Sequence, residues 1–287
     1  MRPLSKTGNY ISNRIGRAIA DYNLIEDKDR ILVAVSGGKD SMTLLKLLAE
    51  RKKWAPISYE LIAMHVETDL KRGGCVYTKS LKAFFDANGI KSHFEKIRVR
   101  EKGREGKRGG EKGKGVSCFW CAWNRRKALF MAADRLGCTK IALGHHKDDI
   151  IETLLLNLLF QGEFAAMNPR QELFGGKIVI IRPLCYVEEE NMKKFARESK
   201  FPSQVCRCPN ADTSKRRMMK DFIKDMEKVC PHVKTNIFRS ISRVKEDYIN
   251  LYPVKNKNID MRGGESNGRK SRKGRDKEEK RLSLLRR

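Results

Sequence analysis

The stretch AVSGGKDSMTLL, residues 34–45, joins an apolar segment to a helix-forming one through two glycines, a lysine and an acid. The segment ILVAVS, residues 31–36, is apolar and β-branched, which predicts a buried strand. The chain from Lys39 onward has the apolar spacing of a helix. A glycine turn between a strand and a helix presents backbone N–H groups that bind phosphate. The stretch therefore predicts an α/β fold with a site for a nucleotide's phosphates.

Residue types in this turn exclude two other phosphate-binding motifs. A P-loop needs a glycine five residues before the glycine of its Gly-Lys pair, and that position is Val33. The dinucleotide motif needs G-x-G-x-x-G, which residues 36–41 do not match. Ser36 and Ser41 can add hydroxyl donors, and Lys39 adds a positive charge. The alternative is a glycine turn that is merely capped by Ser or Asp and binds nothing.

Apolar, β-branched segments recur along the chain with helical patterns between them. The expected strands are residues 31–36, 60–67, 93–99, 140–146 and 177–184. Strands that alternate with helices and are apolar on both faces form a parallel sheet that is covered on both sides. We therefore predict a Rossmann-like α/β fold, with a parallel five-stranded sheet and helices on both faces. Ligands bind at the carboxyl ends of such strands, so SGGKDS, HVETD and GHHKDD are expected to line one crevice.

Charge and apolar patterns divide the chain into three parts. Residues 1–30 are predicted to be an N-terminal helical extension, because apolar residues between positions 8 and 22 form one helical stripe. Residues 31–250 form the main domain, which includes a basic, glycine-rich loop at 98–115. Residues 251–287 are basic and lack hydrophobic periodicity before the last leucines, so we predict a disordered tail there.

The 287-residue chain carries a formal net charge of +27, which exceeds what solubility requires and indicates a polyanionic partner such as RNA or DNA. The basic segments could instead serve solubility alone. A predicted helix at residues 213–229 has a basic face that could follow RNA phosphates. No segment approaches the roughly 20 apolar residues of a membrane span, and the N-terminus lacks the apolar core of a secretory signal. We expect a cytoplasmic protein without membrane contact.

Eight cysteines in a reducing compartment are expected to bind metal or to pack, rather than to form disulfides. Cys118 and Cys121 form a CxxC pair, and Cys206 and Cys208 form a second, tighter pair. Four thiolates could hold a structural zinc ion, although C-x-C is tighter than the usual zinc knuckle. The remaining cysteines are expected to be packing or incidental residues: Cys75, Cys138, Cys185 and Cys230.

Two consecutive acids, Asp148 and Asp149, open a predicted apolar helix. Asp149 with Glu152 could form a capping box, which is a structural role. Asp148 precedes the cap and is freer to hold Mg²⁺ or to help activate a base. His145 and His146 are expected to shape the strand end rather than to bind metal.

SGGKDS after an apolar strand resembles the PP-loop of the ATP pyrophosphatase superfamily, and GHHKDDIIET resembles the second motif of that superfamily. With SCFWCAWNRR and VIIRPLCYV in the same order, the chain over roughly residues 8 to 245 resembles the tRNA 2-thiocytidine synthetase family. The resemblance implies ATP, Mg²⁺ and a [4Fe-4S] cluster held by Cys118, Cys121 and one later cysteine. Cys208 stands at the family's spacing for the third ligand, and Cys206 is the alternative.

The same resemblance implies a set of site residues. The residues expected at the nucleotide are Ser36, Gly37, Gly38, Lys39, Asp40, Ser41, Met64, Gly144 and His145. The residues expected in catalysis are Lys39, Asp40, Arg125, Asp148 and Asp149. The implied reaction transfers AMP to the C2 oxygen of an anticodon-loop cytidine, at tRNA position 32, and replaces that oxygen with sulfur.

Other functions share parts of this pattern. A tRNA 2-thiouridine synthetase has the same plan, and a lysidine-synthetase-like enzyme transfers AMP without a CxxC pair. A zinc-stabilised RNA-binding module with a degenerate phosphate loop would not be an enzyme. For the thiolase, the expected partners are the tRNA anticodon loop and a sulfur donor such as a cysteine desulfurase or free sulfide. A homodimer is compatible with the same plan.

Overall fold

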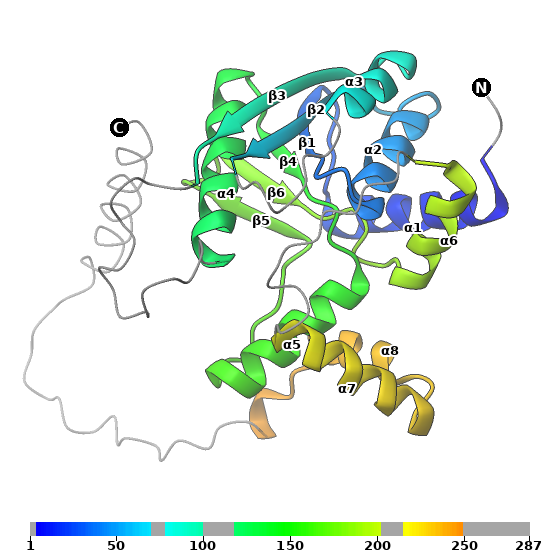
Figure 1. The fold of residues 1–287 in the computed structure, drawn as a ribbon. Coiled ribbons are helices and arrows are strands. Elements are labelled where there is room, and N and C mark those ends of the chain that lie inside the picture. Colours follow the sequence, from blue (N-terminus) through cyan, green and yellow to red (C-terminus); the bar gives the residue numbers. More distant parts are fainter. Residues whose placement is uncertain (1–3, 70–77, 100–117, 202–214, 249–287) are drawn as a thin grey trace, which may run out of the picture.

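The computed structural model describes residues 4–69, 78–99, 118–201 and 215–248. Within them, six strands form one sheet in the order β3-β2-β1-β4-β6-β5 (Figure 1). The strands are β1 (Asp29–Ala34), β2 (Tyr59–Thr68), β3 (Lys91–Ile97), β4 (Lys140–Ala142), β5 (Arg170–Leu173) and β6 (Ile178–Ile181). The five expected strands pair in parallel, which confirms the predicted fold class. β5 is an additional edge strand, antiparallel to β6.

Helices cover both faces of the sheet. They are α1 (Lys6–Tyr22), α2 (Lys39–Arg51), α3 (Thr78–Ala87), α4 (Cys118–Arg135), α5 (Lys147–Gln161), α6 (Glu189–Ser199), α7 (Lys215–Val229) and α8 (Val233–Ser240), followed by the short 3₁₀ helix η1 (Glu246–Tyr248). Successive side chains of a strand point to opposite faces. In β1, Ile31 and Val33 pack with α1, α2, α3 and α6, whereas Leu32 packs with α4. The buried apolar side chains of α1 therefore belong to the core of the main domain.

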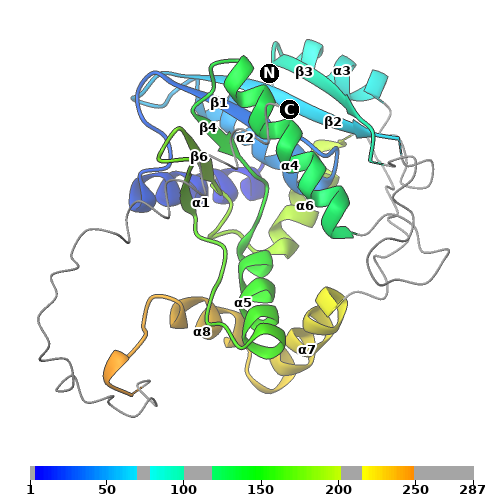
Figure 2. The ribbon, with the colours of Figure 1, turned by 90° about the vertical axis from the view of Figure 1, so that its left-hand side faces the viewer.

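A third apolar cluster lies apart from the sheet. Ile151 and Leu155 of α5 pack against Met219 and Ile223 of α7, with α8 beside them. Figure 2 shows α5, α7 and α8 below the sheet, connected to it through the start of α5. The start of α5 therefore faces both the sheet and the α7–α8 pair. In the part of the chain that the structure describes, no helix is both long and apolar enough to cross a bilayer.

Candidate functional site

The glycine turn predicted to bind phosphate lies between β1 and α2. Gly37 has φ of +85°, a conformation that a residue with a Cβ adopts only with strain. The Ser41 hydroxyl accepts a hydrogen bond from the backbone N–H of Ser36 at 3.2 Å and donates to the Gly38 carbonyl at 3.0 Å. The turn is thus held from inside by one serine of the motif.

A cavity of about 510 Å³ opens beside this turn, at the carboxyl ends of the central strands. Its lining includes these residues named from the sequence: Ser36, Gly37, Gly38, Asp40, Ser41, Met64, Arg125, Gly144, His145 and Asp149. These residues come from the loops after β1 and β4, from β2, and from α2, α4 and α5. Among the described residues, Lys39 and Asp148 were also expected at the site but do not line the cavity.

Gly144 brings the loop after β4 against the phosphate turn. A Cβ built on Gly144 would lie 3.0 Å from the backbone N of Ser41 and 3.1 Å from the carbonyl carbon of Asp40. Contacts this short with backbone atoms are not tolerated without a shift. Glycine at this position therefore allows the two loops to share one cavity wall.

The Asp40 and Asp149 carboxylates both approach the buried His146. His146 Nε2 lies 3.5 Å from Asp149 Oδ2 and 4.0 Å from Asp40 Oδ1. Asp149 Oδ2 also accepts a hydrogen bond from the His146 backbone N–H at 3.0 Å, so this residue caps α5 as well as lining the cavity. Asp40 Oδ1 is buried and has no hydrogen-bond partner among the described residues. A buried acceptor without a partner at the cavity edge suits a cation.

The described residues do not bring three or more His, Cys, Asp or Glu side chains into a metal-binding group. The two carboxylates that approach His146, those of Asp40 and Asp149, line the same cavity. Mg²⁺ is commonly bound by one or two carboxylates together with substrate phosphates and water. Asp40 and Asp149 fit that donor set.

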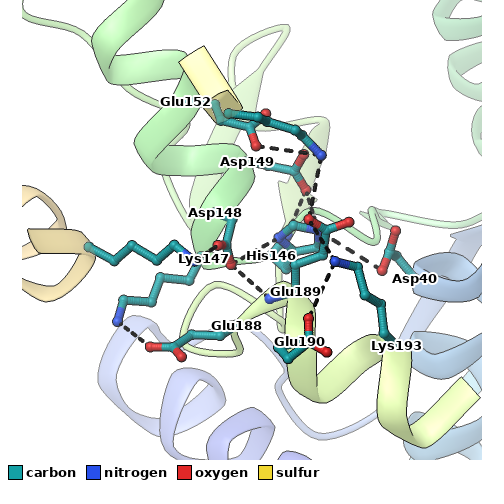
Figure 3. Close-up of polar contacts among 12 residues, drawn as sticks. Asp40, His146, Lys147, Asp148, Asp149, Glu152, Glu188, Glu189, Glu190 and Lys193 are labelled. Carbon is teal, nitrogen blue, oxygen red and sulfur yellow. Dashed lines mark hydrogen bonds and ion pairs between the residues drawn. The ribbon is translucent and has the colours of Figure 1, made fainter. Parts of the chain in front are cut away.

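Asp148 has different contacts from its neighbour. Its Oδ2 accepts a hydrogen bond from the backbone N–H of Glu189 at 2.7 Å, and its Oδ1 lies 3.1 Å from Lys234 Nζ. The side chain is only 7% exposed. Asp148 thus joins α5 to α6 and α8 (Figure 3).

Lys39 is held at the side of the cavity by two carboxylates. Its Nζ lies 3.0 Å from Asp40 Oδ2 and 3.1 Å from Glu189 Oε1. Glu189 is the first residue of α6 and is also ion-paired with Lys193 and Lys220. Burial would raise the pKa of Glu189, but Lys39 and Lys220 hold it at about 2. The sequence EEEN gives no sign of this role, because an acidic helix start is common and needs no ligand.

Basic residues of α7 reach the acids of α5. Arg216 Nη1 lies 3.9 Å from Asp149 Oδ1, and Lys220 Nζ lies 3.6 Å from Glu152 Oε1. Burial raises the pKa of Glu152 to about 7, despite the opposing effect of Lys220. Glu152 Oε2 has no hydrogen-bond partner within the described ranges. Glu152 is therefore a buried carboxyl that α7 only partly neutralises.

Two histidines line the cavity in neutral form. Burial lowers the pKa of His145 to about 4, and Arg182 Nε donates a hydrogen bond to its Nδ1 at 3.3 Å. The proton of His145 therefore resides on Nε2, since Nδ1 accepts. Burial also lowers the pKa of His65, whose Nδ1 bonds the Val35 carbonyl at 2.8 Å. His65 is the first residue of the HVETD segment and was not singled out from the sequence, although that segment was expected to line the crevice.

The CxxC pair marks the start of α4. Cys118 is the first residue of that helix, and Cys121 is a half-buried free thiol one turn later. Arg125 follows Cys121 by four residues and lines the cavity, so α4 connects the cysteine pair to this cavity. The second pair, Cys206 and Cys208, lies outside the described residues.

Three other cysteines are described. Cys138 and Cys185 are buried, and burial raises the pKa of the Cys185 thiol to about 12. Cys230 is half-buried, and Asn236 Nδ2 donates to its sulfur at 3.8 Å. Metal ligands must be thiolates, so the high pKa of Cys185 disfavours such a role.

Comparison with known proteins places the chain in a family. Residues 9–217 match the family described as PP-loop domain. The chain is 41% identical over 241 residues to the tRNA-cytidine(32) 2-sulfurtransferase of Geobacter sulfurreducens, which covers 83% of this chain and 91% of that protein. It is 36% identical to the enzyme of the same name from Paracidovorax citrulli, over 86% of this chain and 78% of that protein.

A solved structure shares the fold. The U34-tRNA thiolase NcsA from Methanococcus maripaludis, solved with its [4Fe-4S] cluster, has a TM-score of 0.61 and 23% sequence identity, with 83% of this chain and 78% of that chain covered. The family match spans most of the chain, and it includes the phosphate turn, the CxxC pair and both aspartates. The chain therefore belongs to the PP-loop family and, within it, to the family of tRNA-cytidine(32) 2-sulfurtransferases.

Proposed function

We propose that this chain is an ATP-dependent tRNA sulfurtransferase that converts cytidine 32 of the anticodon loop to 2-thiocytidine. One observation carries the proposal: α4 begins with the CxxC pair and, one turn later, supplies Arg125 to the same cavity that the phosphate turn lines. A nucleotide and a base bound in this cavity would lie close to the cysteine pair. The relatives that share the family act on this base according to their names.

The phosphate turn is suited to bind the triphosphate of ATP. Its backbone N–H groups, the start of α2 and the Ser36 hydroxyl offer donors to anionic oxygens. Asp40 and Asp149 would hold Mg²⁺, which would neutralise phosphate charge. Arg125 of α4 adds a positive charge to the lining of the same cavity.

In the first step, the C2 oxygen of cytidine attacks the α-phosphorus, and the bond to pyrophosphate breaks. Arg125 and the donors of the turn stabilise the charge that develops on the phosphate. His145, neutral and protonated on Nε2, can donate a hydrogen bond to an oxygen of either reactant. The oxygen at C2 then carries AMP and is a good leaving group.

In the second step, sulfide forms a bond to C2 and AMP leaves with the oxygen. A [4Fe-4S] cluster held by Cys118, Cys121 and Cys208 would supply this sulfide as a soft nucleophile. Cys206 is the alternative third ligand. The half-buried thiol of Cys121 on the cavity-lining helix supports this assignment.

The partners follow from this chemistry. The net charge of +27 favours tRNA, and the exposed Arg217 and Lys224 of α7 could contact its phosphates. We expect the sulfur to come from a cysteine desulfurase or free sulfide, and the enzyme to act in the cytoplasm, where tRNA is modified. A homodimer is also compatible with this function.

Nucleoside mass spectrometry of tRNA from cells with and without the gene tests the proposal. Loss of 2-thiocytidine alone is the expected result. Loss of a 2-thiouridine instead would assign the enzyme to another base. Unchanged thionucleosides, with one zinc per purified chain and no tRNA-dependent release of pyrophosphate, would contradict enzymatic thiolation.

A further inference from the structure

Lys39 belongs to the phosphate-turn motif by sequence, but its ammonium group is ion-paired with two carboxylates. The Nζ lies between Asp40 Oδ2 and Glu189 Oε1, at 3.0 and 3.1 Å. Asp40 is the next residue and moves with Lys39, whereas Glu189 belongs to another helix, 150 residues later. The contact that fixes Lys39 relative to the rest of the protein is therefore the one with Glu189.

Glu189 is itself firmly placed. Its backbone N–H donates to Asp148 Oδ2 at 2.7 Å, and its Oε2 lies 3.5 Å from Lys220 and 3.8 Å from Lys193 (Figure 3). If Lys39 moved away, the Glu189 carboxylate would keep two lysine partners. Releasing Lys39 would thus not leave the Glu189 carboxylate unpaired, which lowers the cost of the movement. The carboxylate of Asp40, the other partner of Lys39, would become available to the Mg²⁺ that accompanies the triphosphate.

We propose that Glu189 is a positioning residue that holds Lys39 at the side of the cavity in the free enzyme and yields it to the triphosphate. This inference rests on the proposed binding of ATP. A lysine ammonium can exchange one anionic partner for another by rotating its flexible stem. The nucleotide therefore competes with Glu189 for Lys39, and the Glu189 carboxylate weakens ATP binding.

Direct titration of ATP with Mg²⁺ into the full-length protein, without tRNA, tests the competition. Glu189→Gln should bind ATP about two- to fivefold more tightly than wild type, the range expected for loss of one partly exposed ion pair. Lys39→Met should bind ATP more weakly. In the double variant, Glu189→Gln should have no further effect, because the residue it acts through is absent.

Glu190→Gln is the matched control. Glu190 is the next residue, is 75% exposed and pairs with Lys193 rather than Lys39. The Glu190→Gln variant should therefore bind ATP as tightly as wild type. Thermal unfolding of each variant, together with Glu189→Asp, separates a folding defect from a change in affinity. Glu189→Asp retains the charge and should not tighten ATP binding.

The outcomes separate the inference from the proposed function. Suppose that wild type binds ATP but Glu189→Gln does not tighten binding, or tightens it by the same factor in the Lys39→Met background. The positioning role is then wrong, and the proposed binding of ATP stands. If wild type binds no ATP, both are overturned. The gain in affinity should also shrink at high salt, because it arises from charge.

Discussion

Asp148 Oδ2 accepts the backbone N–H of Glu189 at 2.7 Å, so the first turn of α5 caps the first turn of α6. The same carboxylate pairs with Lys234 of α8 at 3.1 Å. Asp149, the next residue, faces the cavity instead. Two adjacent acids thus have separate tasks, one in holding three helices together and one at the nucleotide pocket.

This division predicts that substitutions of the two aspartates differ in their effects on stability and on ATP binding. Asp148→Ala should lower the free energy of unfolding by about 2 kcal/mol, since it removes charged hydrogen bonds from a buried site. Asp149→Ala should lower the free energy of unfolding by about 1 kcal/mol, because the cap of α5 is lost. It should reduce ATP affinity more than Asp148→Ala does. Urea unfolding and ATP titration of both variants test this. A larger loss of ATP affinity in Asp148→Ala, at unchanged stability, would contradict the assignment.

Gly144→Ala should disrupt nucleotide binding without removing any charged group. The new Cβ would lie 3.0 Å from Ser41 N, so the loop after β4 must move away from the phosphate turn. We expect ATP affinity to fall about tenfold, because the two loops that share the cavity wall would be displaced from each other. Gly162→Ala is the steric control, because nothing lies within 4 Å of its Cβ, although its positive φ adds some strain. Normal ATP affinity in Gly144→Ala would show that the close approach is not needed.

Arg125 and Arg126 are adjacent on α4, and both are exposed. Of the two, only Arg125 lines the cavity. Arg125→Ala should reduce kcat/KM for thiolation by roughly ten- to a hundredfold, the effect of losing one charge-assisted contact to phosphate. Arg126→Ala should reduce it far less. Steady-state kinetics with varied ATP would measure both. Equal losses would indicate that α4 contributes general positive charge rather than a specific contact.

Glu152 should make stability depend on pH. Its pKa of about 7 in the folded protein exceeds the ordinary value of 4.5, because burial favours the neutral acid. The folded state therefore binds more protons than the unfolded state between these values, and stability falls as pH rises from about 4.5 to 7. Glu152→Gln should remove this dependence and stabilise the protein at pH 8 by an amount on the order of 2 kcal/mol. Urea midpoints at pH 5 to 8 test it, and parallel curves for both proteins would exclude the effect.

The sequence predicts the parts of this site that depend on local order. The phosphate turn, the strand ends and the apolar stripe of α5 are each defined within about 15 residues, so periodicity and turn chemistry suffice to find them. β5 was not predicted, because RQEL is polar and forms a strand by pairing with the edge of β6.

Other features depend on contacts between distant segments. The direction of the Asp148 side chain follows from α6 and α8, which lie 41 and 86 residues later. Likewise, Glu189 looks like an ordinary acidic helix start until the fold brings it to Lys39. Asp148 and Asp149 are indistinguishable by residue type, so only the packed structure assigns them different partners.

The cysteines allow a direct test of the proposed cluster. Cys118→Ser and Cys121→Ser should lose iron and acid-labile sulfide after anaerobic purification, and tRNA from cells carrying them should lack 2-thiocytidine. Cys208→Ser should behave in the same way, whereas Cys206→Ser should retain both if Cys208 is the third ligand. If Cys206→Ser loses iron and 2-thiocytidine while Cys208→Ser retains both, Cys206 is the third ligand.

Cys230→Ser is the control for this series, since Cys230 is half-buried and contacts Asn236 through its sulfur. It should keep full iron content and normal 2-thiocytidine. Because ATP binding depends on the phosphate turn rather than on the cysteines, every cysteine variant should also retain ATP affinity. A Cys118→Ser enzyme that still produces normal 2-thiocytidine would refute the cluster assignment, and one that loses ATP binding as well would show that the substitution disturbs α4 and Arg125.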